Sequence, residues 1–351
     1  MNFHSLKVKN IKRLTPASVR VDFDIPDELK KIYTFKAGQY VTLEIDGVRR
    51  DYSLCSSPLS GEWSIGIKEK SEGFISCYIN SELKIGDALR VSTPRGRFGI
   101  PTKPDEKRTI LAFAAGSGIT PILSVLKYTL ETEEWVNFYL FYSNRTPQDV
   151  MFKEEIDKLK EEYPYNFFPY LFYSQHKVGN WLFEGRLDGP KFQLIVNQLV
   201  DLNEVDETIV CGPNEMISVI TDEVHSSGIP KENIHFELFT VVKDPNAPEE
   251  IPTENKELET VEVTVELDGE VSQLTWDTTK NLVDAMVDAG IDAPYSCKGG
   301  ICSSCMCKIE EGEVTLSENF VLTDSDHEQG IILACCSRPK TNEIRINFDD
   351  V

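Results

Sequence analysis

The 351-residue sequence predicts a multidomain protein: an antiparallel β-barrel, an α/β domain with a doubly wound parallel sheet, and a small α+β domain. Residues 1–103 alternate apolar and polar side chains in short segments, which is typical of antiparallel strands with one buried face. Residues 104–240 alternate strand-length apolar runs with helical stretches, as parallel strands joined by crossover helices do. Residues 241–259 are rich in proline and charge and predict a linker, so the last domain spans residues 260–351.

The chain is strongly acidic, with 36 Lys and Arg against 58 Asp and Glu and a net charge of −22. Phosphate backbones and anionic lipid surfaces repel such a chain, so we expect no nucleic-acid partner and no membrane partner. The longest apolar stretch, residues 110–126, contains two glycines and a proline and does not predict a spanning helix. We therefore expect a cytoplasmic protein.

The first domain contains clear strand patterns and one helical interruption. Residues 19–25 and 41–45 alternate apolar and polar side chains, and turn signals such as Asp46-Gly47 separate the strands. Short strands with frequent turns favour a small closed barrel. Residues 74–83 predict a helix within the series.

The second and third domains have different patterns of predicted strands and helices. In the second, strand-length runs alternate with helical stretches: strands at 109–114, 137–143, 167–172 and 208–211, and helices at 121–132, 150–162, 190–200 and 214–226. The third domain opens with a hairpin, 261–267 and 271–276, joined by the favoured two-residue turn Asp268-Gly269. A helix at 282–289 follows and ends at Gly290.

A cysteine cluster in the third domain indicates an iron–sulfur centre. Cys297, Cys302 and Cys305 have the spacing C-x4-C-x2-C. Cys335 lies 30 positions after Cys305, and Cys336 follows it directly. A [2Fe–2S] cluster needs four thiolates, and this is the spacing of plant-type ferredoxins. A zinc ribbon would need a second C-x2-C pair, and a thioredoxin-like site would open a helix rather than lie in a Gly/Ser loop. The spacing alone leaves Cys335 and Cys336 as alternatives for the fourth ligand.

The segment Arg50-Asp51-Tyr52-Ser53-Leu54 offers groups that suit a flavin: an arginine for a phosphate, an aromatic ring for stacking and a hydroxyl for a ring nitrogen. It resembles the RxYS flavin motif of the ferredoxin–NADP reductase superfamily. Further matches follow in the family's order along nearly the whole chain: Gly38-Gln39-Tyr40, Gly73-Phe74-Ile75-Ser76, Gly116-Ser117-Gly118-Ile119-Thr120-Pro121, Cys211-Gly212-Pro213 and Glu237-Leu238-Phe239. The resemblance extends to reductases of multicomponent oxygenases, and it implies a flavin barrel, a nicotinamide domain and a β-grasp ferredoxin domain.

The resemblance also implies roles for the flavin residues. Arg50 would meet the flavin phosphate, Tyr52 would stack on the flavin, Ser53 would bond near its reactive nitrogen, and Leu54 completes the motif. Residues 73–76 would place a helix N-terminus on the pyrophosphate, through Gly73, Phe74, Ile75 and Ser76. This favours FAD over FMN. Glu72 departs from the family, in which many members have a glycine at that position.

On the nicotinamide side, residues 116–121 form a strand–glycine–helix junction that suits a pyrophosphate. The residues expected to bind the coenzyme here are Gly116, Ser117, Gly118, Thr120 and Pro121. By resemblance, Cys211-Gly212-Pro213 lies at the nicotinamide, Glu237 lies near the hydride-transfer point, and Phe239 covers the flavin face. The alternatives are a buried structural thiol for Cys211 and an ordinary core aromatic for Phe239.

The choice of coenzyme depends on candidate contacts to a 2′-phosphate. Asn144 and Arg145 follow a parallel strand, where an arginine could accept this group, and Arg186 is a second candidate. No acidic residue ends the 137–143 strand to bind a free 2′-hydroxyl. The sequence therefore favours NADPH over NADH, although either arginine could equally be a solvated surface charge.

These parts together predict an NAD(P)H-dependent oxidoreductase of the ferredoxin-reductase type. A flavin must lie between a two-electron hydride donor and a one-electron cluster, so electrons would pass from NAD(P)H through FAD to the [2Fe–2S] cluster. The resemblance implies Cys335 as the fourth ligand and an oxygenase as the acceptor, with phenylacetyl-CoA epoxygenase as one candidate. A Rieske oxygenase, a desaturase, a haem monooxygenase, a non-catalytic redox sensor and a zinc-binding module are the alternatives.

The distribution of charge points to the partner's surface. Residues 260–351 carry 6 Lys and Arg against 18 Asp and Glu, so more than half of the net charge lies on the predicted ferredoxin domain. We expect the acceptor protein to present a basic docking surface to it.

Overall fold

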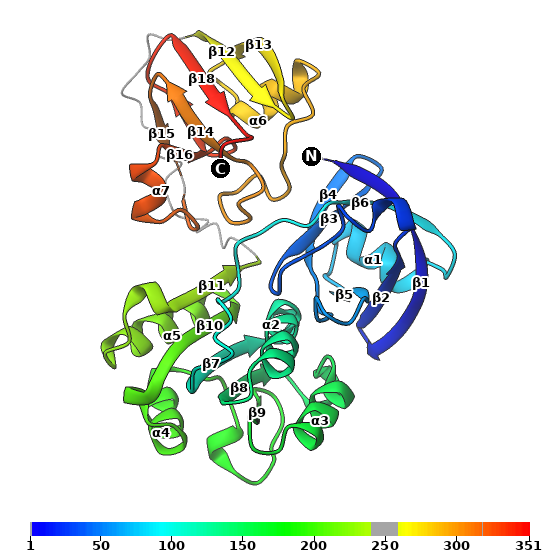
Figure 1. Ribbon diagram of the computed structural model, residues 1–351, viewed down its shortest axis with the longest axis vertical. Coiled ribbons are helices and arrows are strands. Elements are labelled where there is room, and N and C mark those ends of the chain that lie inside the picture. The colour runs from blue at the N-terminus through cyan, green and yellow to red at the C-terminus, as the bar shows by residue number, and fades with distance from the viewer. Residues whose placement is uncertain (1, 240–258, 318) are drawn as a thin grey trace. The chain divides into compact units, whose positions relative to one another are not determined.

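The computed structural model describes residues 2–239, 259–317 and 319–351, which form two compact units (Figure 1). The first unit combines 4–48 and 52–239, and the second contains the C-terminal domain together with residues 2–3 and 49–51. Most of the predicted linker 241–259, and the predicted boundary at residue 240, lie outside the described residues. The multidomain fold predicted from the sequence is confirmed.

The N-terminal barrel is a six-stranded antiparallel sheet in the order β4-β3-β6-β1-β2-β5. Leu54 and Ile65 form an antiparallel bridge between the segments after β4 and within β5, which joins the two edges of the sheet. Its apolar core includes Val21, Val41 and Ile67, each fully buried. The elements are β1 (Phe3–Thr15), β2 (Ser18–Asp24), β3 (Tyr40–Ile45), β4 (Val48–Ser53), β5 (Trp63–Lys68), α1 (Phe74–Ser81) and β6 (Ala88–Ser92).

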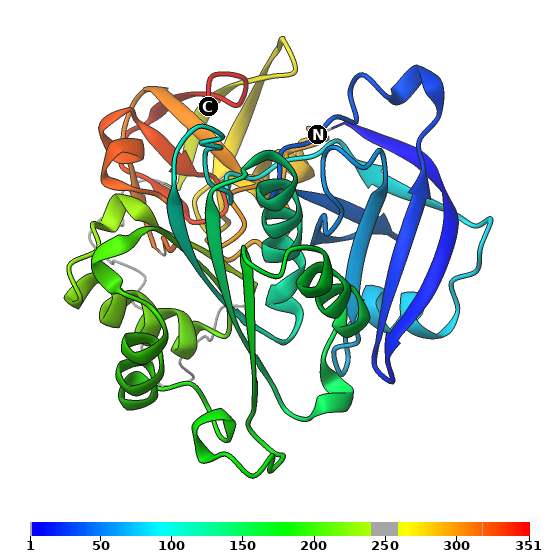
Figure 2. The same ribbon diagram turned by 60° about the horizontal axis from the view of Figure 1, so that its bottom comes forward.

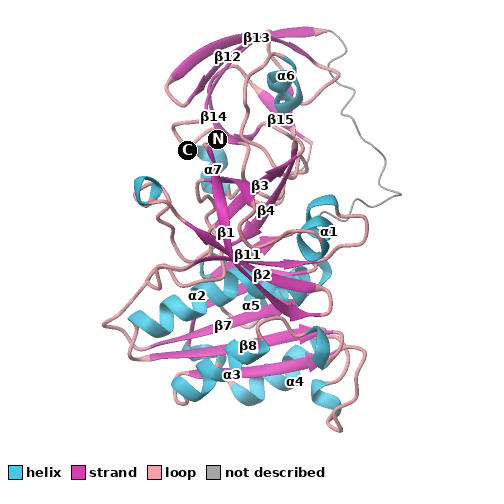
Figure 3. Ribbon diagram, turned by 90° about the vertical axis from the view of Figure 1, so that its right-hand side faces the viewer, coloured by secondary structure: helices cyan, strands magenta, loops and turns pink. Residues whose placement is uncertain are grey.

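The following α/β domain has a five-stranded parallel sheet in the order β11-β10-β7-β8-β9. The order reverses between β7 and β10, so α2 and α3 cover one face while α4 and α5 cover the other, as Figure 2 shows. Figure 3 distinguishes the helices of this domain from its strands by colour. The elements are β7 (Arg108–Ala115), α2 (Ile119–Thr132), β8 (Val136–Asn144), α3 (Lys153–Glu162), β9 (Phe167–Tyr173), α4 (Gly189–Leu199), β10 (Val205–Gly212), α5 (Asn214–Ser226) and β11 (Ile234–Leu238).

The C-terminal domain has a mixed five-stranded sheet in the order β13-β12-β18-β14-β16, against which α6 packs, and a small β15-β17 sheet. Trp276 is fully buried in its core and donates its indole N–H to the Lys280 carbonyl at 2.9 Å. The elements are β12 (Thr260–Leu267), β13 (Glu270–Asp277), α6 (Leu282–Asp288), β14 (Met306–Glu311), β15 (Val314–Leu316), α7 (Asp324–Glu328), β16 (Ile331–Leu333), β17 (Ser337–Pro339) and β18 (Glu343–Asn347).

Candidate functional site: a flavin–nicotinamide junction and a cysteine cluster

The glycine loop after β7 meets the end of β10 at the point where the strand order reverses. A Cβ on Gly118 would lie 2.1 Å from the Cys211 carbonyl oxygen, so only glycine allows the two segments to approach this closely. A Cβ on Gly212 would likewise meet the Met216 side chain at 2.6 Å. Ligands of open α/β sheets bind at the carboxyl ends of such strands, and the predicted coenzyme residues 116–121 and 211–213 converge there.

The loop conformation is fixed by local hydrogen bonds. Gly116 adopts φ +55°, and its carbonyl accepts the buried Tyr142 hydroxyl at 2.8 Å. Thr120 donates its hydroxyl to the Ser117 carbonyl at 3.0 Å. Helix α2 begins at Ile119, with Pro121 in its first turn, so the free N–H groups of the helix start lie at the loop.

Three of the residues predicted to act in catalysis meet beside this loop. Cys211 and Glu237 are paired in register across the parallel strands β10 and β11. Ser53, at the end of β4 in the barrel, donates its hydroxyl to the Glu237 carboxylate at 3.2 Å. Burial, and secondarily the Glu237 charge, raise the pKa of the Cys211 thiol well above its ordinary value. Phe239 follows β11 and remains 36% exposed.

The flavin motif lies at the end of β4. The Tyr52 ring is half-buried, Ser53 is buried and Leu54 lies in the barrel core. Arg50 has an exposed side chain that donates to the Arg49 carbonyl at 2.6 Å. The motif thus leaves the Tyr52 ring and the Arg50 guanidinium accessible, while Leu54 packs in the barrel core.

The start of α1 is the predicted pyrophosphate site. Gly73 precedes the helix, and the Ser76 hydroxyl donates to the Gly73 carbonyl at 3.0 Å while accepting the Lys70 N–H at 3.1 Å. Ile75 is buried in the core and Phe74 is 48% exposed. The backbone N–H groups of this turn, rather than the Ser76 hydroxyl, are the groups left to meet a phosphate.

Glu72 explains why a glycine is frequent at its position. It adopts φ +65°, in the left-handed region that glycine occupies without a steric penalty. The departure from the family pattern therefore places a non-glycine residue in a strained backbone conformation directly before Gly73, the N-cap of α1.

The candidate 2′-phosphate residues do not form a single cluster of contacts. Asn144 ends β8 with a buried side chain, and Arg145 beside it is exposed. Arg186 pairs with Glu215 at 3.3 Å, with both side chains 83% exposed. Glu215 lies in the first turn of α5, directly after the Cys211-Gly212-Pro213 segment.

Lys68 is a candidate coenzyme residue that the sequence interpretation missed. It ends β5 of the barrel, and its Nζ lies 3.6 Å from the position that a Cβ on Gly116 would take. An ammonium group at the glycine loop suits a pyrophosphate. Only the packing of the barrel on the α/β domain reveals it, because no local signal separates Lys68 from other strand-end lysines.

The four predicted cluster ligands form two neighbouring pairs in the C-terminal domain. Hydrogen bonding with Cys302 lowers the pKa of Cys297 to about 7, and hydrogen bonding with Cys305 lowers the pKa of Cys335 to about 4. The pKa values of Cys302 and Cys305 are raised, first by the same hydrogen bonds and then by burial. Opposite pKa shifts of this kind arise when one thiol of each pair donates a hydrogen bond to the sulfur of the other.

The loop around these pairs suits a [2Fe–2S] cluster, which takes two thiolates on each iron. The Gly299 N–H donates to the Cys297 sulfur at 3.3 Å, and Lys298, Gly300 and Ser303 all have positive φ. This folding of the backbone turns N–H groups toward sulfur, as iron–sulfur sites require. In the described residues, no three Cys, His, Asp or Glu side chains converge as ligands of one metal ion.

Cys336 stays close enough to remain an alternative ligand. Its sulfur lies 3.5 Å from that of Cys335, and both residues are buried. Cys307 is fully buried in the domain core, and burial raises its pKa.

Comparison with known proteins identifies the three domains. Residues 5–100 match an oxidoreductase FAD-binding domain, residues 113–222 an oxidoreductase NAD-binding domain and residues 265–340 a 2Fe-2S iron–sulfur cluster binding domain. One component of the 1,2-phenylacetyl-CoA epoxidase from Escherichia coli K12 is 35% identical, over 99% of this chain and 98% of that protein. The chain belongs to the ferredoxin reductase components of multicomponent oxygenases.

A further relative supports this membership, and a solved structure shows the same fold. The ferredoxin reductase component of 3-ketosteroid-9-alpha-monooxygenase from Rhodococcus rhodochrous is 34% identical, over 98% of this chain and 96% of that protein. The solved structure of phthalate dioxygenase reductase shares the fold, with a TM-score of 0.61 and 24% identity over 99% of this chain and 98% of that one. The predicted oxidoreductase activity and the predicted FAD, nicotinamide and [2Fe–2S] cofactors are confirmed. Within the described residues, no helix is long and apolar enough to cross a membrane.

Proposed function

We propose that this reductase takes hydride from NADPH at the junction of β4, β10 and β11 and passes single electrons through its [2Fe–2S] cluster to an oxygenase. The observation that carries the proposal is the contact of Ser53 with Glu237, which is itself in register with Cys211. When bound, FAD supplies the conversion of a two-electron hydride donor into a one-electron donor. No general base is required, so the side chains act by binding and orientation.

Each residue of the junction has a distinct task in this proposal. Glu237 accepts the Ser53 hydroxyl proton in a hydrogen bond, which fixes the hydroxyl at the end of the flavin motif. Cys211 stays a neutral thiol because burial raises its pKa, so it contacts an uncharged ring without adding charge. Tyr52 and Phe239 contribute partly exposed aromatic faces. In the C-terminal domain, Cys297, Cys302, Cys305 and Cys335 would hold the cluster.

Anaerobic titration of the purified protein with NADPH tests the proposal. We expect loss of flavin absorbance followed by a rhombic electron paramagnetic resonance signal from the reduced cluster on freezing. Flavin bleaching without the cluster signal would exclude the relay. Failure of both coenzymes to bleach the flavin, with negligible dye reduction, would instead support a redox sensor.

The preference for NADPH is proposed from basic groups near the nicotinamide domain's strand ends. Arg145 follows β8 and is exposed, without an acidic residue at the end of that strand to bind a 2′-hydroxyl. We expect Arg145→Ala to raise KM for NADPH about tenfold or more while changing KM for NADH less than about twofold, since one charged hydrogen bond contributes ~1.5–3 kcal/mol. Arg186→Ala tests the second candidate for this contact in the same way; that side chain is 83% exposed and paired with Glu215. Equal effects on both coenzymes would contradict the assignment.

The proposed acceptor is the oxygenase part of a phenylacetyl-CoA epoxidase, with a basic docking surface. The proposal rests on the 35% identity to a component of that enzyme and on the acidic C-terminal domain. Reconstitution with the oxygenase part of the epoxidase should support substrate turnover. Faster turnover with a 3-ketosteroid monooxygenase, or with another Rieske, desaturase or haem acceptor, would reassign the partner.

A further inference from the structure

Helix α2 connects the glycine loop of the nicotinamide domain with the segment that follows the flavin motif in the barrel. At its N-terminus it begins at the glycine loop, and three of its side chains hydrogen-bond to the segment that follows the flavin motif. Ser124 donates to the Ser56 carbonyl at 2.7 Å, and Lys127 donates to the Cys55 carbonyl at 2.9 Å. These residues lie three positions apart and therefore on one face of the helix.

A third contact completes this face, since the Glu131 carboxylate accepts the Ser57 hydroxyl. Three consecutive barrel residues, 55–57, are thus bound by three residues of one helix. The flavin motif ends at Leu54, so the bonded segment starts at the very next residue. A displacement of α2 would be transmitted to the motif through a single peptide unit.

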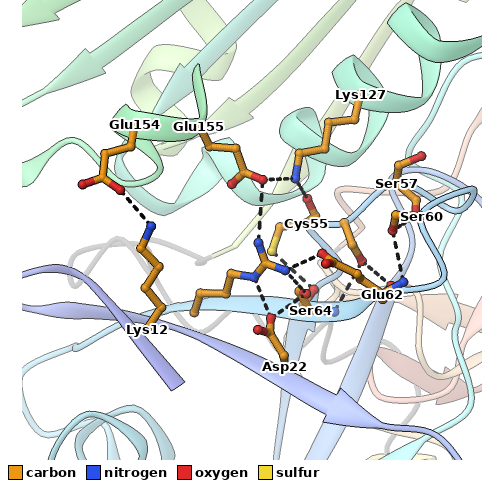
Figure 4. A network of polar contacts seen from close by, with 12 residues as sticks. Lys12, Asp22, Cys55, Ser57, Ser60, Glu62, Ser64, Lys127, Glu154 and Glu155 are labelled. Atoms are coloured by element: carbon orange, nitrogen blue, oxygen red, sulfur yellow. Dashed lines mark hydrogen bonds and ion pairs between the residues drawn. The ribbon is translucent and has the colours of Figure 1, made fainter. Parts of the chain in front are cut away.

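Lys127 also connects this contact to an ion-pair network (Figure 4). Its Nζ lies 2.6 Å from Glu155 of α3, and its side chain is only 11% exposed. Glu155 also faces Arg20 of β2 at 3.7 Å. Arg20 in turn contacts Asp22 at 2.6 Å, which ties the network to the barrel wall.

The first turn of α2 is also held at close range by the barrel. A Cβ on Gly66 of β5 would lie 2.7 Å from the Thr120 side chain and 2.8 Å from the Phe152 ring. Because Gly66 has no side chain, the backbone of β5 packs directly on the Thr120 side chain at the start of α2. Together with the 55–57 contacts, this fixes α2 against the barrel near both of its ends.

We propose that α2 is the spacer that sets the separation of the flavin and nicotinamide sites, and that Lys127 is its positioning residue. This inference rests on the proposed function. Hydride transfer needs the reacting atoms at near-contact distance, and a shift of ~1 Å costs about a hundredfold in rate. Lys127 touches neither the flavin motif nor the glycine loop, so it acts only through the placement of α2.

The test compares Lys127→Met with the wild-type protein by anaerobic stopped-flow reduction of the bound flavin. Met keeps most of the length of the side chain but removes its donors and charge. We expect the limiting reduction rate to fall about tenfold or more, with the coenzyme Kd and the FAD content unchanged within about twofold. Lys127→Arg, which retains charge and donors, should restore most of the rate.

Lys12→Met is the matched control. Lys12 pairs with Glu154 at 2.8 Å across the same two domains, but the two side chains are 56% and 85% exposed. Exposed ion pairs contribute little, so this variant should keep the wild-type rate within about twofold. A loss equal to that of Lys127→Met would overturn the assignment of a specific role to Lys127.

A second readout does not depend on turnover. Hydrogen–deuterium exchange of the resting full-length protein should be faster over residues 54–57 in Lys127→Met than in the wild type, and unchanged in Lys12→Met. If Lys127→Met does not fold, Ser124→Ala removes one contact of the same face and should lower the rate about fivefold.

The outcomes separate this inference from the proposed function. A wild-type protein whose flavin neither coenzyme reduces would refute the proposed function. A wild-type protein that is reduced normally, with Lys127→Met reduced at the same rate, would refute only the spacer. A lower FAD content together with an unchanged rate for the loaded fraction would likewise refute positioning and leave a purely structural role.

Discussion

At the scale of single residues, the backbone conformation of Glu72 is as informative as any side-chain contact. Its φ of +65° lies in the left-handed region, where a residue with a Cβ is strained and glycine is not. Glu72 lies just before Gly73 and the helix predicted to bind the flavin pyrophosphate. A carboxylate at this position also opposes the approach of a phosphate. Both the backbone strain and the charge of Glu72 are therefore unfavourable at this position.

We expect Glu72→Gly to increase FAD affinity and to stabilise the barrel by about 0.5–1 kcal/mol, because relief of the left-handed strain exceeds the added freedom of the unfolded chain. Glu72→Ala separates the two effects, since it removes the charge and keeps the Cβ. Flavin retention during dialysis and the midpoint of thermal unfolding measure the result. Equal gains in both variants would assign the effect to charge alone.

Cys55 connects the network behind the flavin motif to the stability of the protein at high pH. Burial raises its pKa to about 12, and its thiol donates to the Ser64 carbonyl at 3.3 Å. An unfolded cysteine loses its proton at about pH 8.5, so above that pH the unfolded state binds fewer protons than the folded state.

Stability should consequently fall as the pH rises from about 8.5 to about 12, by up to ~1.4 kcal/mol per pH unit for this thiol. The thermal unfolding midpoint, followed across this range, should decline less steeply in Cys55→Ala than in the wild type. Parallel slopes would show that Cys55 does not contribute.

At the scale of elements, a buried ion pair joins the strand and the helix on either side of the glycine loop. Arg108 at the start of β7 lies 2.6 Å from Glu133 at the end of α2, with the side chains 1% and 0% exposed. Glu133 also accepts the Lys103 N–H at 3.1 Å. The pair closes the β7–α2 unit at the end opposite the coenzyme loop.

Glu133→Gln should destabilise the protein by about 3–5 kcal/mol, because it leaves the Arg108 charge buried without its partner. Lys153→Met, which breaks an exposed pair with Asp157 on α3, should cost less than about 0.5 kcal/mol. Thermal or chemical unfolding of both variants decides the comparison. A small loss in Glu133→Gln would mean that water or a neighbouring group compensates Arg108.

The elements also show what sequence periodicity can predict. The pattern of the long amphipathic helices and the apolar strands of the parallel sheet predicts their bounds to within a few residues: α2 begins at Ile119 and ends at Thr132, where the sequence predicts 121–132. The edge strand β11 and three-residue strands such as β17 escape prediction, because short segments carry too little periodicity.

The candidate site divides in the same way. The glycine loop, the flavin motif and the cysteine spacing are local patterns, and the sequence alone is enough to recognise them. The position of Lys68 at the glycine loop, and the binding of α2 to residues 55–57, depend on contacts between distant segments. Their residue types are ordinary for a strand end and a helix face, so only the fold could reveal them.

At the scale of the whole molecule, the acidic charge is concentrated on the C-terminal domain, where 18 acidic residues oppose 6 basic ones. Such a concentration attracts a basic partner over distances set by the ionic strength. It provides no sequence-specific contact by itself. Its effect should therefore appear in the rate of association rather than in the rate of electron transfer within the complex.

Raising the salt concentration from about 50 mM to about 300 mM should lower the second-order rate of electron delivery to the oxygenase about tenfold or more. Flavin reduction by the coenzyme, measured in the same buffers, is the internal control for general salt effects. An unchanged delivery rate would rule out electrostatic steering by this domain.

The contacts of α2 with residues 55–57 also determine how reductases of this type can be recombined. Side chains of α2 hydrogen-bond to the backbone of the barrel, and the barrel and the α/β domain, residues 4–48 and 52–239, form one compact unit. A chimera that exchanges residues 4–239 as one block keeps every one of these contacts, whereas a crossover near residue 104 splits them between two parents. Libraries of hybrid reductases should therefore yield active members mainly from crossovers after residue 239, which makes the barrel and the α/β domain together the smallest portable part of the coenzyme-oxidising half.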